Sequence, residues 1–202
     1  MFLKKLLFVI TLYILILVFF QCTCLLYADR IQAFSSINAG LQYKLNTNRN
    51  SFHDFWKHDI GIKGFIETPF YFGCIQAGIQ MDSFLRINYK VYDFQTVNLY
   101  VGWGKKWLLP YNFKCFTGFN IGNALMIFDE EKNQYEDQYN IEQELRTGIE
   151  LYFSIPIQKK MDIYLTESYS VIYTYHRIRL NFISVGISYS FTTPKWFREF
   201  MK

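Results

Sequence analysis

Three histidines are the residues with the chemistry best suited to catalysis at neutral pH. His53 and His58 lie beside a polar segment that also holds Ser51 and Asp54, and His176 lies far along the chain. A serine, a histidine and a carboxylate can assemble into a catalytic triad from distant positions, so the spacing alone does not exclude one. Histidines in polar loops are more often solvated than catalytic, and we therefore expect that this protein is not an enzyme.

Other patterns of cofactor or metal chemistry are missing from the sequence. It has no glycine-rich phosphate loop, no paired zinc-ligand spacing and no nucleotide-binding fingerprint. Of the four cysteines, Cys22 and Cys24 lie near the N-terminus, which leaves Cys74 and Cys115 as isolated thiols. Two isolated thiols make neither a disulfide framework nor a metal site. We expect no cofactor and no metal, with both cysteines serving as small apolar residues on strands.

Charged residues recur at alternate positions of otherwise apolar runs. Glu144, Arg146 and Glu150 share one face of the run 140–155, and the other face of that run is apolar. Side chains alternate across a strand, so these charges would all point to one side of a sheet. The charges that we expect inside are Lys44, Asp59, Lys63, Glu67, Lys114, Glu144, Arg146, Glu150 and Asp162. Buried charges must be paired, so a structural ion-pair network is favoured over an ion path.

The last strand shows the alternation most clearly. Between Ile183 and Phe191 the odd positions are all apolar, and the even positions are serine or glycine. A soluble sheet would normally carry charge on its wet face, whereas this polar face is small and uncharged. The combination suits the narrow lumen of a barrel whose apolar face meets lipid.

Eight alternating runs follow one another, with no long amphipathic helix between them. They cover about 36–45, 58–67, 70–82, 91–104, 113–126, 140–155, 161–173 and 179–191. The breaks after the odd-numbered runs are mostly longer and more polar, near 46–57, 83–90, 127–139 and 174–178. The other breaks are shorter or contain proline, at 68–69, 105–112 and 156–160. Long loops on one side and short turns on the other are typical of a membrane-spanning barrel, and an even strand number closes it without free edges.

The composition favours a membrane β protein. Aromatic residues make up 20% of the chain and charged residues only 19%, against about a quarter charged in soluble domains. Aromatic side chains gather at the headgroup level of membrane barrels. Those near the predicted strand ends, which we expect to be interfacial anchors, are Trp56, Trp103, Trp107, Tyr189 and Phe191.

The N-terminal segment resembles an export signal. A short basic head, 1–5, precedes an apolar run, and Ala28 is a suitable residue before a cleavage site. We expect 1–28 to be a signal peptide. An uncleaved anchor remains an alternative, because the apolar run could span a bilayer. A lipoprotein acylated at Cys22 or Cys24 is another, because these cysteines follow the apolar run. Without Lys4 and Lys5 the net charge falls from +4 to about +2, too little to argue for a nucleic-acid partner.

Two features depart from a simple barrel. Glu167 falls on the outer face of the run 161–173, where a carboxylate in mid-bilayer would be costly, and a bulge or a register change would move it. After Phe191 the chain continues through 192–202, a basic and aromatic tail that we expect at the inner membrane surface.

The export signal, the eight runs and the Phe-ended last strand together resemble the small outer-membrane barrels of the OmpA, OmpX or OmpW type. The resemblance rests on architecture over 36–191 and implies an all-β fold, an eight-stranded antiparallel up-and-down transmembrane β-barrel over 29–191. It implies the outer membrane of a diderm, Gram-negative-type bacterium, with outer-membrane lipids and the barrel-assembly machinery as partners. An extracellular partner would be reached through the loops 46–57 and 127–139.

The expected role is structural or in surface interaction, without catalysis, because the lumen of so narrow a barrel is plugged by side chains. Two alternatives remain. A lipid-modifying acyl hydrolase or transferase of the same architecture predicts a serine and a carboxylate beside one of the histidines at a strand end. A soluble periplasmic ligand binder of lipocalin type predicts an apolar cavity with charge outside.

Overall fold

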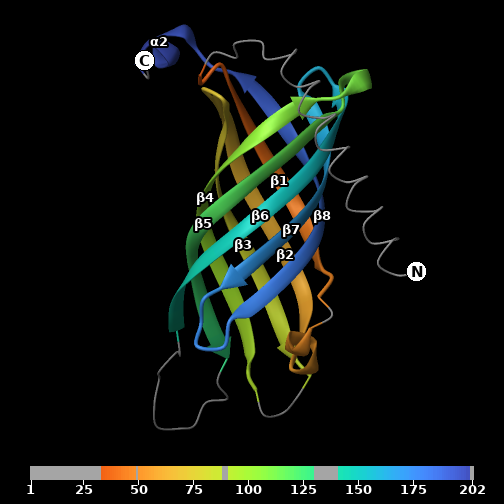
Figure 1. Ribbon diagram of the computed structural model, residues 1–202, viewed down its shortest axis with the longest axis vertical. Coiled ribbons are helices and arrows are strands. Elements are labelled where there is room, and N and C mark those ends of the chain that lie inside the picture. The colour runs from red at the N-terminus through yellow and green to blue at the C-terminus, as the bar shows by residue number, and fades with distance from the viewer. Residues whose placement is uncertain (1–32, 49, 88–90, 130–140, 201–202) are drawn as a thin grey trace, which may run out of the picture. The chain divides into compact units, whose positions relative to one another are not determined.

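The computed structural model describes residues 33–48, 50–87, 91–129 and 141–200, so the expected signal peptide lies outside the described residues. The strands are β1 (Ser36–Asn46), β2 (Trp56–Phe70), β3 (Gly73–Arg86), β4 (Asp93–Leu108), β5 (Lys114–Asp129), β6 (Ile141–Gln158), β7 (Met161–Ile172) and β8 (Ile178–Thr192). Each strand pairs with the next, and β8 returns to β1 (Figure 1). The predicted closed antiparallel barrel of eight strands is confirmed. Among the described residues, no helix has the length and apolar character needed to cross a membrane.

The seam between β1 and β8 follows the predicted alternation. Leu41 pairs with Ile187 and both are exposed, while Gln42 pairs with Gly186 and is buried. The two strands approach closely here: a Cβ atom on Gly186 would lie 2.2 Å from the backbone oxygen of Leu41 and 2.6 Å from Cγ of Gln42. Only glycine fits at this position of the seam.

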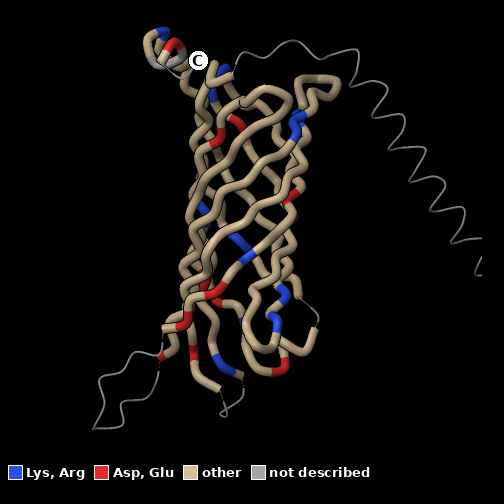
Figure 2. Tube along the Cα trace, turned by 60° about the vertical axis from the view of Figure 1, so that its left-hand side comes forward, with Lys and Arg blue, Asp and Glu red and all other residues tan. Residues whose placement is uncertain are grey.

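The outer wall of the barrel is apolar. Most positions along the barrel trace are neither acidic nor basic, as Figure 2 shows. Every strand exposes more than half of at least one large apolar side chain: Leu41, Ile66, Met81, Leu99, Phe119, Ile149, Leu165 and Val185. Monomeric soluble proteins rarely expose contiguous apolar surface on this scale, whereas a wall in lipid requires it. The lipocalin-type alternative, which places charge outside, is wrong.

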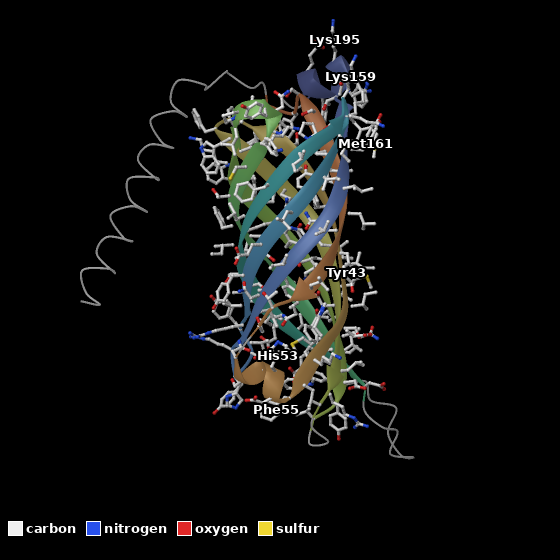
Figure 3. All side chains as sticks on the ribbon, turned by 90° about the vertical axis from the view of Figure 1, so that its right-hand side faces the viewer. Tyr43, His53, Phe55, Lys159, Met161 and Lys195 are labelled. Atoms are coloured by element: carbon white, nitrogen blue, oxygen red, sulfur yellow. The ribbon has the colours of Figure 1, made fainter. Side chains whose placement is uncertain are left out.

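The two ends of the barrel differ in their connections. At one end the strands are joined by 71–72, 109–113 and 159–160, and at the other by 47–55, 87–92, 130–140 and 173–177. We call these the turn end and the loop end. Figure 3 shows His53 and Phe55 at the loop end and Lys159, Met161 and Lys195 at the turn end. A short helix, α2 (Lys195–Phe200), follows β8 within the expected tail.

Three strands continue through segments that we expected to be turns, and one of them, β6, runs through Pro156 to Gln158. β2 runs through 68–69 to Phe70, and Pro69 pairs with Cys74 at the turn end of the sheet. Proline is tolerated there because its missing N–H falls where the ladder ends. β4 extends to Leu108, which pairs with Lys114, so 105–107 belongs to the wall. The ladder is longer than the sequence alternation because the neighbouring strand still offers hydrogen-bonding partners.

A bulge in β2 corrects the prediction for Asp59. His58 pairs with Phe84 and Gly61 pairs with Asp82, so two residues of β2 oppose one residue of β3. Asp59 and the residue after it are both exposed, and His58 takes the inward position instead. The expectation that Asp59 lies in the lumen is wrong, because the extra residue reverses the faces of β2 on the loop side of the bulge.

Charge at two positions of β8, one in the middle of the outer face and one exposed at the strand end, should separate a lipid-facing wall from a water-facing one. Val185→Arg places a base in the middle of the apolar wall, and we expect it to lower the free energy of unfolding by about 2–4 kcal/mol. Thr192→Arg, at the strand end, should cost about 0–1 kcal/mol. Urea unfolding of the barrel in lipid vesicles, followed by tryptophan fluorescence, measures both values. Equal effects within about 0.5 kcal/mol, as at an ordinary wet surface, would contradict the lipid-facing assignment.

Candidate functional site in the barrel lumen

Buried side chains in the interior of the barrel form two clusters and a polar layer. The turn-end cluster consists of Phe65, Cys74, Phe116, Tyr152 and Tyr164. The loop-end cluster consists of Phe52, Phe84, Phe94, Ala124, Met126, Ile172, Leu180 and Phe182. Between them lies a polar layer of buried charges, amides and hydroxyls. Eight strands leave just enough space for such a filling.

Two buried ion pairs cross the polar layer. Lys63 of β2 contacts Glu150 of β6 at 2.5 Å, and these strands lie on opposite walls of the ring. Lys44 of β1 donates to both carboxylate oxygens of Asp82 at 2.8 and 2.7 Å. All four side chains are at most 5% exposed. Each charge is thus offset by its partner, which compensates for the loss of water around it.

Arg146 completes the polar layer near the middle of β6. Its Nη1 donates to Asn120 Oδ1 at 3.3 Å, and its guanidinium lies 6.0 Å from the ring of Tyr100. Lys44 is also placed against an aromatic face, 3.8 Å from the centre of the Phe182 ring. The cations therefore join the polar layer to the aromatic side chains around it.

Glu67 is the acceptor at the centre of the turn-end side of the lumen. It accepts from Lys106, from the hydroxyl of Tyr152 at 2.7 Å and from Nδ2 of Asn38 at 3.3 Å. These three donors come from β4, β6 and β1, so a single carboxylate joins four strands. Lys114 of β5 also pairs with Asp162 of β7, at 2.6 Å. The turn end is held by these cross-lumen contacts.

The predicted charges fall into three groups. Those that point inward and have the partners described above are Lys44, Lys63, Glu67, Lys114, Arg146, Glu150 and Asp162. Glu144 is half-buried near the loop end, opposite the buried Ala124. Asp59 faces outward, as described above. Sequence reasoning did not include Asp82 and Lys106 in the charge set. Both occupy alternate positions of their strands that point into the lumen.

Most of the aromatic residues expected as anchors lie on the outer wall, and one of them points inward. Trp103, Tyr189 and Phe191 are exposed on the outer wall, and Trp107 is half-buried near the end of β4. Trp56 was expected among them, but it packs against the loop-end cluster, and its indole N–H donates to the carbonyl of Tyr92 at 2.8 Å. The prediction is wrong for Trp56 because the bulge in β2 turns it toward the lumen.

The loop-end cluster is closed by Phe52, which lies on the short helix η1 (Ser51–Asp54). Its ring is 5.2 Å from the rings of both Phe84 and Trp56. The preceding segment is tied to β8, because Asn48 Nδ2 donates to the carbonyl of Arg179 at 2.6 Å and Asn48 Oδ1 accepts from the backbone N–H of Asn181 at 2.5 Å. This connection therefore carries a side chain that covers the lumen.

The histidines do not form the constellation that an acyl-transfer enzyme needs. His58 Nε2 lies 3.5 Å from Asp82 Oδ1 inside the barrel, His53 is on η1, and His176 stacks edge-on against Tyr175. In the part of the chain that the structure describes, no serine hydroxyl is hydrogen-bonded to any of them. The same residues contain no group of three or more potential metal ligands.

A closed ring of eight antiparallel strands, with polar groups inside and apolar groups outside, defines the fold of the small outer-membrane barrels. Structure comparison agrees. The chain is similar to neisserial surface protein A, with a TM-score of 0.57 and 11% identity over 77% of this chain and 96% of that one. It is also similar to outer membrane protein OprG from Pseudomonas aeruginosa, with a TM-score of 0.52 and 9% identity over 81% and 99%. At these identities the likeness is one of fold. No protein-family model and no curated protein sequence matches the chain.

The buried pair between Lys63 and Glu150 can be tested by a double-mutant cycle. Lys63→Met and Glu150→Leu each leave one charge buried without its partner, so each should lower the free energy of unfolding by about 3–5 kcal/mol. The double variant should recover most of this loss, because no unpaired charge remains. Urea unfolding in lipid vesicles measures the cycle. Single variants within about 0.5 kcal/mol of the wild type would show that the pair is not desolvated.

Proposed function

We propose that this protein is a closed, non-catalytic barrel of the outer membrane that acts through its loop end. The observation that supports the proposal is the set of buried side chains in the lumen. Aromatic and apolar clusters lie at both ends, and the charges between them are paired with one another. An open pore needs a continuous wet path, and in this proposal these side chains block it. The function then falls to the surfaces outside the lumen.

The loop end offers side chains suited to recognition. The exposed aromatic residues there are Phe55, Tyr92, Tyr173 and Tyr175, and Tyr175 is 96% exposed. The guanidinium of Arg177 lies 5.7 Å from the ring of Tyr173. Tyrosine and arginine are the residue types that contribute most to protein–protein interfaces. We propose that an extracellular partner contacts the 173–177 connection and the loops 46–57 and 127–139, the last of which lies mostly outside the described residues.

The apolar wall supports an outer-membrane location. Short turns of bacterial barrels face the periplasm and longer loops face outward, so the turn end would be periplasmic. The N-terminal segment would direct export, the barrel-assembly machinery would insert the strands, and the tail with α2 would lie at the periplasmic surface. Exposed Trp196 and Phe200 of α2 fit contact with that surface.

Electrical recording tests whether the barrel is closed. The full chain reconstituted in planar bilayers should give no stepwise conductance, because the lumen is occupied from end to end. An open porin inserted in the same membranes is the positive control. Reproducible single-channel steps from the purified wild-type barrel would contradict the proposal.

Cysteine labelling in intact cells tests the orientation. Tyr175→Cys should react with a membrane-impermeant maleimide added from outside, and Lys159→Cys at the turn end should react only after the outer membrane is permeabilised. The wild type gives the background, since Cys74 and Cys115 are buried. Labelling of Lys159→Cys but not Tyr175→Cys in intact cells would reverse the orientation, and equal labelling of both would argue against insertion in the outer membrane.

A further inference from the structure

One carboxylate stands on the lipid side of the wall. Glu167 lies in the middle of β7, where it pairs in regular register with Leu151 of β6 and Ile183 of β8. The bulge or register change that would turn it inward is not there, because the only shift in this ladder is at Pro156 and Gln158. The side chains of Glu167 and Ile183 are exposed. So are those of Ile149 and Phe153, which flank Leu151 on the outer face of β6.

The surroundings of Glu167 are apolar on every side. Exposed Ile149 and Phe153 lie on β6, exposed Ile183 and Val185 lie on β8, and exposed Leu165 precedes it on the same face of β7. On β6 the outward apolar residues continue past Leu151 toward both ends of the barrel, from Leu145 to Ile157. The carboxylate therefore lies within the apolar band and not at its edge.

No side chain that the structure describes pairs with Glu167. In the described residues it has no hydrogen-bond or ionic partner, and the nearest outward base on the adjoining strand, Arg179, is four residues from Ile183. Four residues of a strand span about 13 Å. An ionisable side chain in the hydrocarbon region is expensive, and such residues normally pair with a group on another element. The described residues supply no partner at the depth of Glu167.

We propose that the outer face of β6–β8 around Glu167 is the interface of a dimer with a second copy of this chain. Two copies in one membrane share the same orientation, so their two-fold axis runs along the membrane normal and equal depths meet. Glu167 then faces Glu167 of the partner subunit. Two carboxyl groups that share a proton form a hydrogen bond, with one group as donor and the other as acceptor. The apolar side chains around them pack against each other.

The second copy is favoured by the chemistry at this depth. The outward residues that surround Glu167 are apolar and include no base, so a contact with any of these residues on a second copy would leave the carboxyl unpaired. A second carboxyl at the same depth is both donor and acceptor, and the only one that the band supplies among the described residues is Glu167 itself. The proposal rests on the wall facing lipid, which the Val185→Arg experiment tests separately.

Native mass spectrometry of the purified chain, over a series of protein-to-detergent ratios, measures the association. The wild type should form a dimer, and Glu167→Leu should weaken its association by roughly 3- to 20-fold, the range for one interchain hydrogen bond in a membrane. Glu167→Gln should retain the dimer, because two primary amides also pair reciprocally. Asn123→Leu is the matched control, since it removes an exposed polar side chain between Leu99 and Leu145 on β5, and should leave association unchanged.

Folding is checked for every variant by the difference in gel mobility between boiled and unboiled samples. Glu167→Leu should unfold at the same or a higher urea concentration than the wild type under conditions where both are monomeric, because it removes a carboxyl from lipid. The proposal is overturned if the wild type is monomeric at all ratios, or if Glu167→Leu associates as strongly as the wild type. A Glu167-dependent complex of a mass that does not match two copies would overturn it in favour of a different partner.

Discussion

Closure of the backbone ladder between β1 and β8 is the constraint on which the rest of the structure depends. Lipid offers no water to unpaired N–H and C=O groups, so a sheet in a membrane must have no edge. The pairing runs from Ser36 with Thr192 to Asn46 with Phe182, the full length of β1. Closure of only eight strands makes a narrow ring, and because lipid surrounds that ring, its polar side chains must point into the lumen. The inward serines and glycine of β8 and the outward isoleucines of the same strand are two results of that single condition.

The filling of the lumen follows from the narrowness of the ring. Charges there are far from bulk water, and each one costs free energy unless another side chain replaces its solvent. Lys63 and Glu150 meet across the ring, and Glu67 collects donors from three other strands. These contacts join walls that the backbone ladder does not join directly. Hydrogen bonds hold neighbouring strands together, and the side chains of the polar layer hold opposite strands together.

Much of the fold was accessible from the alternation of residue types, because a strand in a membrane barrel has the same two environments along its whole length. The eight strands, their order and the faces of most residues follow from it, and so does the outward position of Glu167. The bulge at His58 and Gly61 could not be predicted, since it inserts one residue without an unusual composition, and it reversed the expectations for Asp59 and Trp56. Lys106 was missed because proline and aromatic residues nearby suggested a turn at 105–112. The partners of the charges were also out of reach: Lys63 and Glu150 are 87 positions apart and meet only because the ring closes.

The tether between the first loop-end connection and β8 has a consequence for the order of assembly. Asn48 and Asn50 hydrogen-bond to backbone groups of Arg179 and Asn181, which belong to the last strand to leave the ribosome. These hydrogen bonds can form only after that strand is in place beside β1. In an incomplete barrel the tether is therefore absent, and it forms in the same step as the final strand pairing. Closure of the barrel and attachment of the first loop-end connection therefore occur together. An intermediate without β8 in place lacks both the β1–β8 pairing and this attachment.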